Sequence, residues 1–513
     1  MNFFDLVDSQ IADAAASLWD FRAETALAVT IVAMLLVKTF DFGRRVNNTY
    51  LALVGAVTAL VLGLPLDAWR SGLGVSSRPL FTGMIVYDAF AVYMRSLILG
   101  FVALLAVFVR ISGVPRRDDA TDFFVLVLGA ALGMCLMVSA NHMLVVFLGI
   151  EMASVPSYAL AGMLKHRRTS SEAALKFAVF GAGTAGIMLY GISLLVGTLG
   201  SAHLPTMAAQ LADLLHTGAG AERGAVLVLG GLMVAVGLAF KLSAFPFHFW
   251  APDVFEGAAA EVGAFLSVAS KTAALALLVR LALTFGRVDS TLVVGLLMLL
   301  SAVTCTFGNL AAYGQTNMKR LLAYSTIAHA GYLMMPVAAA VSVIGTRPEL
   351  AREAVAAMAF YATVYLFMNT AAFAATAFLR NAVGSEEIDD FAGLVRRSPG
   401  LAMCMIVVLF SLIGMPPLAG FSAKFTVFAS LYRTEMLGLL LIGVLNTVLS
   451  LFYYLRVLKV MIFAPEGPRM QEARIPLLSA AGLYCLALTA PLVALFVWWG
   501  PLPWAEAAAR ALV

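Results

Sequence analysis

Residues 230–265 read GGLMVAVGLAFKLSAFPFHFWAPDVFEGAAAEVGAF, and the organisation of the whole chain follows from this stretch. An apolar run leads into Lys241 and is then interrupted by Pro246 and Pro252 before the next apolar segment begins. In lipid, backbone that leaves the helical ladder is tolerated only where it is buried in protein or lines a wet cavity. A lysine near mid-membrane costs about 2.5–3.5 kcal/mol on insertion scales. Because an ion path would offset both costs, the stretch predicts a broken transmembrane helix at a functional site.

The composition is that of a polytopic membrane protein. Of the 513 residues, 62% are hydrophobic and 12% are charged, whereas soluble domains contain about 25% charged residues. We therefore expect an all-α fold that crosses the membrane many times. With about 20 apolar residues per span, the sequence predicts fourteen transmembrane helices, near residues 23–39, 49–66, 87–111, 121–140, 142–163, 171–200, 225–249, 260–284, 290–312, 319–342, 350–379, 399–430, 435–463 and 475–500.

Several other kinds of site are disfavoured by the sequence. Its four cysteines stand singly in apolar segments, which predicts neither a disulfide framework nor a metal cluster. Residues 180–186, FGAGTAG, fit the dinucleotide pattern GxGxxG, but no strand precedes them, and small residues there favour close helix packing. The N-terminal MNFFDLVDSQ lacks a basic leader, so we expect no cleavable signal peptide. No stretch indicates a nucleic-acid surface or a catalytic triad.

The distribution of Lys and Arg predicts the orientation. These residues gather in the loops after odd-numbered helices, which places those loops in the cytoplasm. With fourteen helices, both termini would then face outward. Five basic residues remain inside apolar spans, and they are the candidates for chemistry: Arg95, Lys176, Lys241, Lys271 and Lys424.

Two five-helix units with inverted topology are the second expectation. The seventh span, broken at Pro246, has a counterpart in the twelfth, where Pro416 and Pro417 interrupt the helix and Lys424 follows. Transporters built from inverted repeats place their sites on such broken helices. The pattern predicts an N-terminal three-helix segment at 1–120, repeats at 121–285 and 286–463, and a C-terminal helix at 464–513.

The candidate proton carriers are one carboxylate and three lysines. Glu151 lies about nine residues into the fifth span, roughly 14 Å deep, and ionisable residues at such depth usually mark function. Burial lowers the pKa of a lysine and a nearby carboxylate raises it again, so the pair can hold and release a proton. We therefore predict that Glu151, Lys241, Lys271 and Lys424 transfer protons. The alternative is that Glu151 only bonds a neighbouring helix and that the three lysines have structural roles.

Four further residues have less specific signals. Lys176 could relay protons or could be a structural lysine near the interface, because Glu172 precedes it at helical-pair spacing. Histidine titrates near neutral pH, so His248 and His329 are possible relays, the alternative being a buried histidine bonded to backbone. Arg95 has Asp88 two turns before it, and we expect a structural role.

Three stretches carry a family resemblance: AFKLSAFPFHFWAPDVFEGA, GNLAAYGQTNMKRLLAYSTIAHAGYLM and FSLIGMPPLAGFSAKFTVF. They resemble the antiporter-like membrane subunits of respiratory complex I, the proton-translocating NADH:quinone oxidoreductase. PDVFEGA and a lysine in the twelfth helix resemble the N-type (subunit 2) branch. The resemblance covers about residues 121–463. After EGA the family usually has a stretch with proline and threonine, whereas this sequence has Ala259, Ala260 and Glu261.

The resemblance implies roles for four residues. Glu151 matches the essential carboxylate of the fifth helix, and Lys241 matches its lysine partner. Lys271 matches the central relay lysine, and Lys424 matches the lysine of the outward half-channel. The resemblance also implies a bacterial inner-membrane location, neighbouring M and K subunits, and NADH, FMN, iron-sulfur clusters and quinone in partner subunits, with no cofactor bound by this chain.

An energy argument leads to the same class of function. Driving one proton outward against about 150 mV takes roughly 3.5 kcal/mol, and the sequence contains no nucleotide, flavin or cluster motif. Partner subunits must therefore supply the energy. Two alternatives remain at this stage: the large subunit of a cation/proton antiporter or related membrane-bound hydrogenase, and a passive membrane scaffold.

Overall fold

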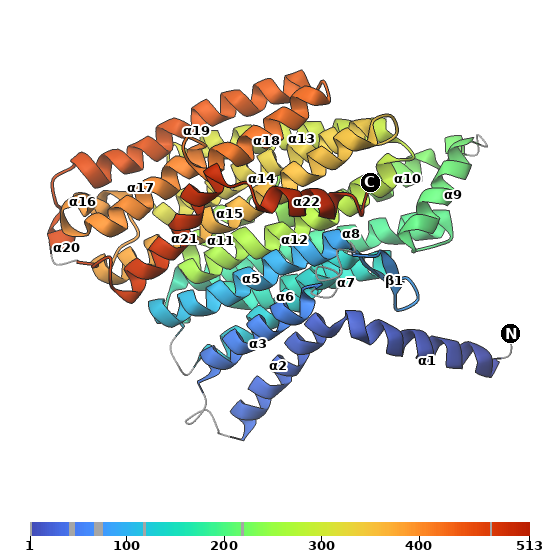
Figure 1. Cartoon of the computed structure of the whole chain (residues 1–513), viewed down its shortest axis with the longest axis horizontal. Helices are drawn as coiled ribbons and strands as arrows, with labels where there is room; N and C mark the ends of the chain where they lie inside the picture. Colours follow the sequence, from blue (N-terminus) through green and yellow to red (C-terminus); the bar gives the residue numbers. More distant parts are fainter. Residues whose placement is uncertain (1–2, 41–46, 66–74, 116–118, 217–219, 472–473) are drawn as a thin grey trace.

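The computed structural model describes residues 3–40, 47–65, 75–115, 119–216, 220–471 and 474–513. Within these residues the chain folds into a bundle of roughly parallel and antiparallel helices (Figure 1). Within the described residues, eleven helices are long and apolar enough to cross a membrane. They are α5 (Ala89–Ser112), α6 (Ala120–Ser139), α7 (Met143–Ala161), α8 (Arg168–Leu199), α10 (Gly220–Leu242), α12 (Ala260–Gly286), α13 (Ser290–Ala312), α14 (Met318–Val343), α15 (Pro348–Val383), α19 (Leu437–Phe463) and α21 (Ala480–Val497).

The other three predicted spans are also helical, which confirms the all-α polytopic class. The first two correspond to α2 (Arg22–Thr39) and α3 (Asn48–Gly63), and the twelfth is divided into α17 (Pro399–Ile413) and α18 (Ala419–Arg433). The seventh span was predicted to reach residue 249, but its helix α10 ends at Leu242. The interruption therefore comes before Pro246, because the chain turns as soon as the Lys241 turn is complete.

Short elements at the two ends of the bundle lie outside the predicted spans. Figure 1 shows α16 (Leu394–Arg397) and α20 (Pro468–Gln471) at one end, which we call the α20 end, together with η3 (Ile388–Phe391). The opposite end, called the α9 end, carries α9 (Leu204–His216) and the antiparallel strands β1 (Arg78–Leu80) and β2 (Ile85–Tyr87), in which Arg78 pairs with Tyr87. The remaining helices are α1 (Phe3–Asp20), α11 (Trp250–Gly257) and α22 (Pro501–Ala509).

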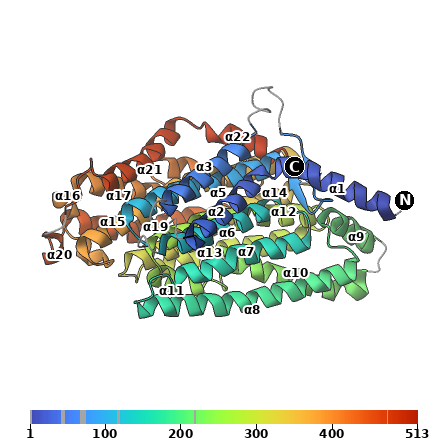
Figure 2. The ribbon, with the colours of Figure 1, turned by 90° about the horizontal axis from the view of Figure 1, so that it is seen from below.

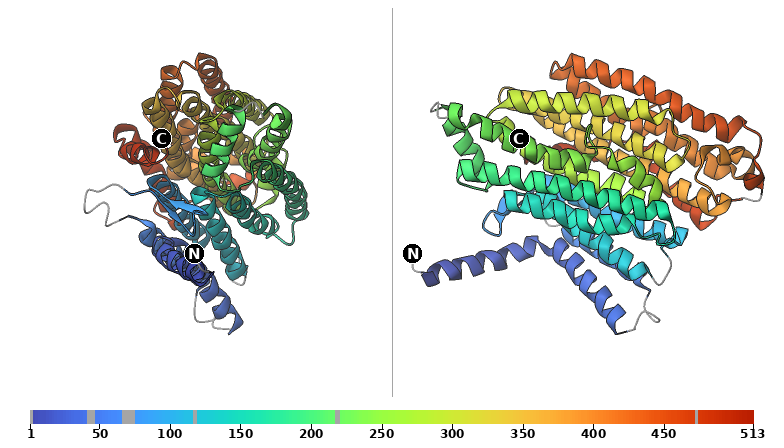
Figure 3. Two further views of the ribbon diagram at one scale, coloured as in Figure 1. Left: turned by 90° about the vertical axis from the view of Figure 1, so that its right-hand side faces the viewer. Right: turned by 180° about the vertical axis from the view of Figure 1, so that it is seen from behind.

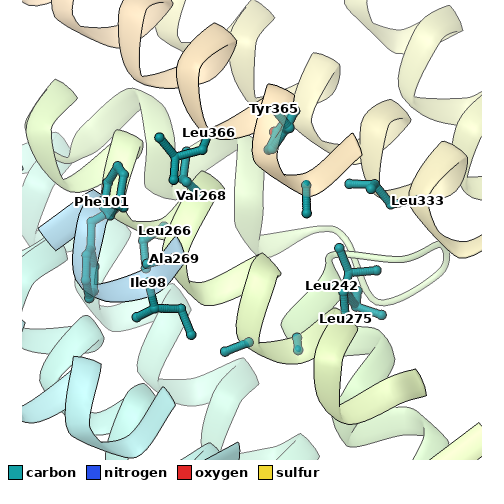
Figure 4. Close-up of a cluster of buried hydrophobic side chains, with 14 of the residues drawn as sticks. Ile98, Phe101, Leu242, Leu266, Val268, Ala269, Leu275, Leu333, Tyr365 and Leu366 are labelled. Carbon is teal, nitrogen blue, oxygen red and sulfur yellow. The ribbon is translucent and has the colours of Figure 1, made fainter. Parts of the chain in front are cut away.

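Burial separates central helices from peripheral ones. In α12, α14 and α15, 94% of the apolar window is buried, against 28% in α8 and α13. A helix that is apolar all round and also buried belongs to the core of a bundle, so these three helices form the centre. Figure 4 shows Leu266, Val268 and Ala269 of α12 surrounded by side chains from neighbouring helices. Seen from below in Figure 2, α8 and α10 run along an outer edge.

The N-terminal helices lie at the periphery of the bundle. In Figure 3, α1 projects beyond the bundle while α2 and α3 pack along its side. The α1 helix is tied to the hairpin by Ser17 Oγ, which accepts from the Phe81 amide at 2.9 Å, and by Asp13, which accepts from the Thr82 amide at 2.7 Å. The C-terminal α22 packs against α5 and α15.

Candidate functional site

The break after α10 is a helix cap with an unusual residue. Ser243 has a φ of 55°, in the left-handed region that normally favours glycine. Its amide bonds the Phe240 carbonyl at 3.0 Å, and the Ala244 amide bonds the Ala239 carbonyl at 2.8 Å. This pair of bonds is the Schellman motif. It satisfies earlier carbonyls of the last turn and leaves the carbonyl of Leu242 available to another donor.

The break between α17 and α18 repeats this geometry. Gly414, with a φ of 89°, takes the position of Ser243, and its amide bonds the Ser411 carbonyl at 3.0 Å. The Met415 amide bonds the Phe410 carbonyl, also at 3.0 Å. The two helices thus end in the same motif, and the carbonyl left available here is that of Ile413. A proline follows the last helical residue at the same spacing in both breaks, as Pro246 and as Pro417, the second residue of the Pro416-Pro417 pair.

A buried lysine binds each of these free carbonyls. Lys271, in the middle of α12, donates from Nζ to the Leu242 carbonyl at 2.9 Å and to the Thr326 carbonyl of α14 at 3.2 Å. Lys424, in α18, donates from Nζ to the Ile413 carbonyl at 2.9 Å. The last carbonyls of a helix lack intrahelical partners and carry a partial negative charge, so they attract cations. Each broken helix is therefore held by a lysine.

Lys241 and Glu151 form a looser pair. Lys241 is in the last turn of α10 and is 4% exposed. Glu151, on α7, is half-buried and lies within electrostatic range of Lys241. Among the described residues, neither side chain makes a close ion pair. The two groups can influence each other's charge without being locked together.

The two histidines have different surroundings. His329 of α14 contacts Tyr361 of α15, with Nδ1 and Oη 2.7 Å apart, and it lies within electrostatic range of both Lys271 and Lys424. Its partner is a side chain and not the backbone. His248 is buried in the break between α10 and α11, among Phe245, Phe249 and other rings. The His248 Nδ1 has no hydrogen-bond partner within the described part of the chain.

Lys176 belongs to an ion-pair network at the α20 end. Its Nζ lies 2.7 Å from Glu172 and 2.7 Å from Asp253 of α11. Arg320, at the start of α14, joins Asp253 at 2.8 Å to Glu256 at 2.6 Å. Partial burial raises the pKa of Asp253, but hydrogen bonds from Lys176 and Arg320 outweigh that effect and hold the pKa below its ordinary value. The network fastens α11, the segment after the break, to α8 and α14.

Arg95 has a structural partner that the sequence did not indicate. Its Nη1 lies 2.9 Å from Glu24 Oε1, and both side chains are buried. Asp88, two turns before Arg95, caps α5, accepting from the Ala91 amide, and pairs with Arg280 of α12 at 2.8 Å. Glu24 is on a different helix from Arg95, and sequence spacing cannot reveal such a contact.

Two basic residues at the edges of predicted spans are buried in helices. Lys319 is fully buried in α14, and Arg380 is inside α15, whose helix continues to Val383. They meet Glu261 and Glu386 near the α20 end. Lys319 is the first residue of the predicted span 319–342, and Arg380 directly follows the predicted span 350–379, so the sequence favours positions at the membrane surface for both and gives no sign of the cluster.

Asn446 of α19 belongs to a neutral hydrogen-bond network that joins α19 to α13. Asn446 of α19 accepts from Asn309 Nδ2 of α13 at 3.0 Å and donates to Thr306 Oγ1 at 3.0 Å. Tyr453 donates to Asn309 Oδ1 at 3.1 Å. The side-chain amides of Asn309 and Asn446 each donate and accept hydrogen bonds, so the contact between α13 and α19 is polar without being charged.

No group of three or more His, Cys, Asp or Glu side chains that could hold a metal occurs in the part of the chain that the structure describes. The four cysteines are all buried and free. The polar centre of the bundle contains lysines and carboxylates, which can bind and release protons, together with amides and hydroxyls, which can hydrogen-bond them or water.

Comparison with known proteins identifies the family. Residues 140–450 match the family described as NADH:quinone oxidoreductase/Mrp antiporter, transmembrane. The chain belongs to this family. It is 35% identical to NADH-quinone oxidoreductase subunit N of Anaeromyxobacter sp., over 99% of this chain and 98% of the relative. The matched region contains Glu151, Lys241, Lys271 and Lys424, so all four lie within the part that defines the NADH:quinone oxidoreductase/Mrp antiporter family.

Solved structures agree with this family assignment. A chain in respiratory complex I from Thermus thermophilus with bound aureothin is 30% identical, with a TM-score of 0.72, over 94% of this chain and 98% of that chain. A chain of the Mrp complex from Dietzia sp. is 19% identical, with a TM-score of 0.79, over 97% and 98%. The second likeness concerns the fold alone. The antiporter-like membrane fold is therefore shared across assemblies of different kinds.

Proposed function

We propose that this chain is the N-type membrane-arm subunit of a proton-translocating NADH:quinone oxidoreductase. Its own part is to carry protons across the membrane, while other subunits oxidise NADH and reduce quinone. One observation carries the proposal: Lys271 is buried at the centre of the bundle and is held by two carbonyl groups, with no carboxylate paired to it among the described residues. A buried cation without a counter-ion is costly and is well suited to exchanging a proton.

The proposed path runs along Glu151, Lys241, Lys271 and Lys424. Glu151 and Lys241 are within electrostatic range of each other at the first break, and Lys271 donates a hydrogen bond to Leu242 at the same break. His329 would relay between Lys271 and Lys424, because both lysines lie within electrostatic range of it. His248 and Lys176 are further possible relays on the α11 side. The matching caps at Leu242 and Ile413 support two inverted units at 121–285 and 286–463.

Partner subunits complete the proposed assembly. We infer that NADH, FMN, iron-sulfur clusters and quinone are bound by other subunits, and that M- and K-type membrane subunits are the neighbours. The proposed location is the bacterial inner membrane, with both termini periplasmic. The α20 end, with Lys319 and Arg320, would then face the cytoplasm.

A cation/proton antiporter subunit is the second candidate, and the likeness to the Mrp chain favours it at the level of fold. Lys424 in the twelfth span and the PDVFEGA sequence favour the N-type branch instead. A passive scaffold is the third possibility. A scaffold role does not explain why Lys241, Lys271 and Lys424 are all buried, since a buried charge is costly.

Purification in mild detergent, followed by activity measurement, tests the proposal. The tagged chain should co-purify with NADH-oxidising and quinone-reducing subunits, and vesicles containing the assembly should take up protons when NADH is oxidised. Lys271→Ala should assemble and pump fewer protons per NADH. Co-purification with antiporter subunits alone, and proton exchange driven by a cation gradient without NADH, would contradict the proposal.

A further inference from the structure

A buried cluster of four charged side chains lies near the α20 end of α12 and takes no part in the proposed path. Lys319 Nζ of α14 lies 2.9 Å from Glu386 Oε2 and donates to the Ala258 carbonyl at 2.7 Å. Arg380 of α15 reaches toward Glu386 on one side and Glu261 of α12 on the other. Three helices and the loop after α15 thus meet at this point.

Glu261 is the exceptional member. Its side chain is 0% exposed, and both carboxylate oxygens lack a hydrogen-bond partner within the described residues. A buried ionised carboxylate normally accepts several hydrogen bonds, because leaving it without them is very costly. A proton on the carboxyl group removes this cost.

Arg380 is poised between two carboxylates and hydrogen-bonds neither. Its Nη2 lies 3.6 Å from Glu261 Oε1, and its Nη1 lies 3.9 Å from Glu386 Oε1. The guanidinium instead donates to Asn381 Oδ1 at 2.9 and 3.2 Å. Glu386 Oε1 also lacks a hydrogen-bond partner in the described structure. A small movement of Arg380 toward Glu261 would stabilise Glu261 as an anion and leave Glu386 with Lys319 as its only cation among the described residues. A movement toward Glu386 would leave Glu261 to hold a proton.

One member of the cluster, Glu261, is on the same helix as the central lysine, Lys271. Glu261 and Lys271 are on the same helix, ten residues and therefore about 15 Å apart. Next to Lys271, Thr326 accepts from Asn369 Nδ2 of α15 at 3.3 Å, and Asn369 Oδ1 has no hydrogen-bond partner among the described residues. Between the two ends, the Phe373 ring packs where Gly263 has no side chain; a Cβ there would lie 2.8 Å from the ring. Helices α12 and α15 thus carry polar groups at both ends of a short apolar barrier.

We propose that Glu261 is a proton-binding residue that feeds Lys271 from the α20 end, with Arg380 as the positioning residue that controls its charge. The inference rests on the proposed function. In the first transfer an O–H bond of the protonated Glu386 carboxyl breaks, an O–H bond forms on Glu261, and Glu386 becomes the anion that Arg380 and Lys319 stabilise. In the second, the O–H bond of Glu261 breaks, water that enters between Glu261 and Lys271 carries the proton inward, and an N–H bond forms on neutral Lys271, which leaves Glu261 as the anion.

The charged groups around Glu261 come from several elements. They are Arg380 on α15, Glu386 in the following loop and Lys319 on α14, while Arg167, before α8, acts on Lys319 from a greater distance. The only ion pair of Glu261 among the described residues is the long one with Arg380. The position of Arg380 should therefore decide the protonation of Glu261.

Proton pumping per NADH by the assembled complex in vesicles is the first test. Glu261→Gln keeps the shape of the side chain but cannot exchange a proton, and it should lower the ratio as far as Lys271→Ala does. Glu261→Asp should retain part of the pumping. The control is Glu387→Gln, which changes an exposed glutamate of the neighbouring loop that binds Asn317, and it should pump like wild type. Wild-type pumping by Glu261→Gln, with reduced pumping by Lys271→Ala, would overturn this inference alone. Wild-type pumping by both variants would overturn the proposed function as well.

Infrared difference spectroscopy supplies a second measurement that does not depend on pumping. The wild-type complex should show a protonated carboxyl band on energisation that Glu261→Gln lacks and Glu261→Asp shifts. An unchanged band in both variants would overturn the inference. If Glu261→Gln alone fails to assemble, Glu261→Gln/Arg380→Gln removes the carboxylate and its cation together. Wild-type pumping by that double variant would also overturn the inference. If neither variant assembles, the carboxyl band of Glu261→Asp decides: a shifted band supports the inference and an unchanged band overturns it.

Discussion

Lys271 Nζ donates a 2.9 Å hydrogen bond to the carbonyl of Leu242, the last residue of α10. The bond joins the centre of α12 to the point where α10 breaks, and Lys424 makes the same kind of bond to the end of α17. An ammonium at a helix C-terminus is favoured by the helix dipole, and a neutral amine lacks that attraction. Loss of a proton should therefore loosen the hold on the broken helix, which couples charge to backbone position.

The first prediction concerns Glu151. Glu151→Gln keeps the size of the side chain but removes the charge that acts on Lys241, so it should lower proton pumping per NADH more than Glu151→Asp, which retains a carboxylate. The measurement is proton uptake by vesicles containing the assembled complex. Equal losses in the two variants would mean that side-chain length, and not charge, is what matters at this position.

The second prediction concerns Lys241. Because Lys241 makes no hydrogen bond or close ion pair with the described residues, Lys241→Ala removes a proton carrier without leaving a buried partner uncompensated. We expect normal assembly and a reduced number of protons pumped per NADH. Blue native electrophoresis checks assembly. An assembled Lys241→Ala complex that pumps at the wild-type ratio would exclude this lysine from the path.

The third prediction separates structure from transport. Glu24→Gln removes the partner of buried Arg95, and breaking such a pair costs about 3–5 kcal/mol. The thermal stability of the assembled complex should fall, while the fraction that survives pumps normally. Glu24→Leu/Arg95→Met, which removes both charges, should recover most of the lost stability. Failure of the double variant to recover any stability would show that the pair has a role beyond charge compensation.

The fourth prediction uses pH. The folded-state pKa of Asp253 lies below its ordinary value, so its ion pairs contribute stability that is complete above the unfolded-state pKa of about 3.9. That contribution is lost as the pH falls through the lower, folded-state pKa. Asp253→Asn lacks this ion-pair contribution at every pH. When the pH is lowered below about 4, the melting temperature of Asp253→Asn should therefore decrease less than that of the wild type. Parallel decreases in the two proteins would show that Asp253 adds nothing to acid stability.

Some of the site can be predicted from the sequence and some cannot. Lys241, Lys271 and Lys424 could be identified because a lysine within an apolar run is conspicuous without any partner. The partners of Arg95 and Arg380 could not, since Glu24 and Glu261 are on other helices and only packing brings them close. The fourteen spans follow from apolar length alone. The helices α1, α9 and α22 are shorter or more polar, and their positions depend on tertiary contacts.

The last prediction tests whether Lys271 gives up its proton. Lys271→Arg preserves the positive charge and much of the packing, and its guanidinium can still donate to the carbonyls of Leu242 and Thr326. The guanidinium, however, effectively never deprotonates in a protein. If Lys271 passes a proton between Lys241 and Lys424, the arginine variant should assemble, oxidise NADH when uncoupled, and lose proton pumping to the same extent as Lys271→Ala.

Lys424→Glu is the companion variant for this test. A carboxylate can also bind and release a proton, so its effect on pumping should be milder than that of Lys271→Arg, although it loses the bond that Lys424 makes to Ile413. Proton uptake per NADH is measured for both variants under identical conditions. A fully active Lys271→Arg complex would show that this position only holds charge at the end of α10. The path from Lys241 to Lys424 would then have to bypass the centre of α12.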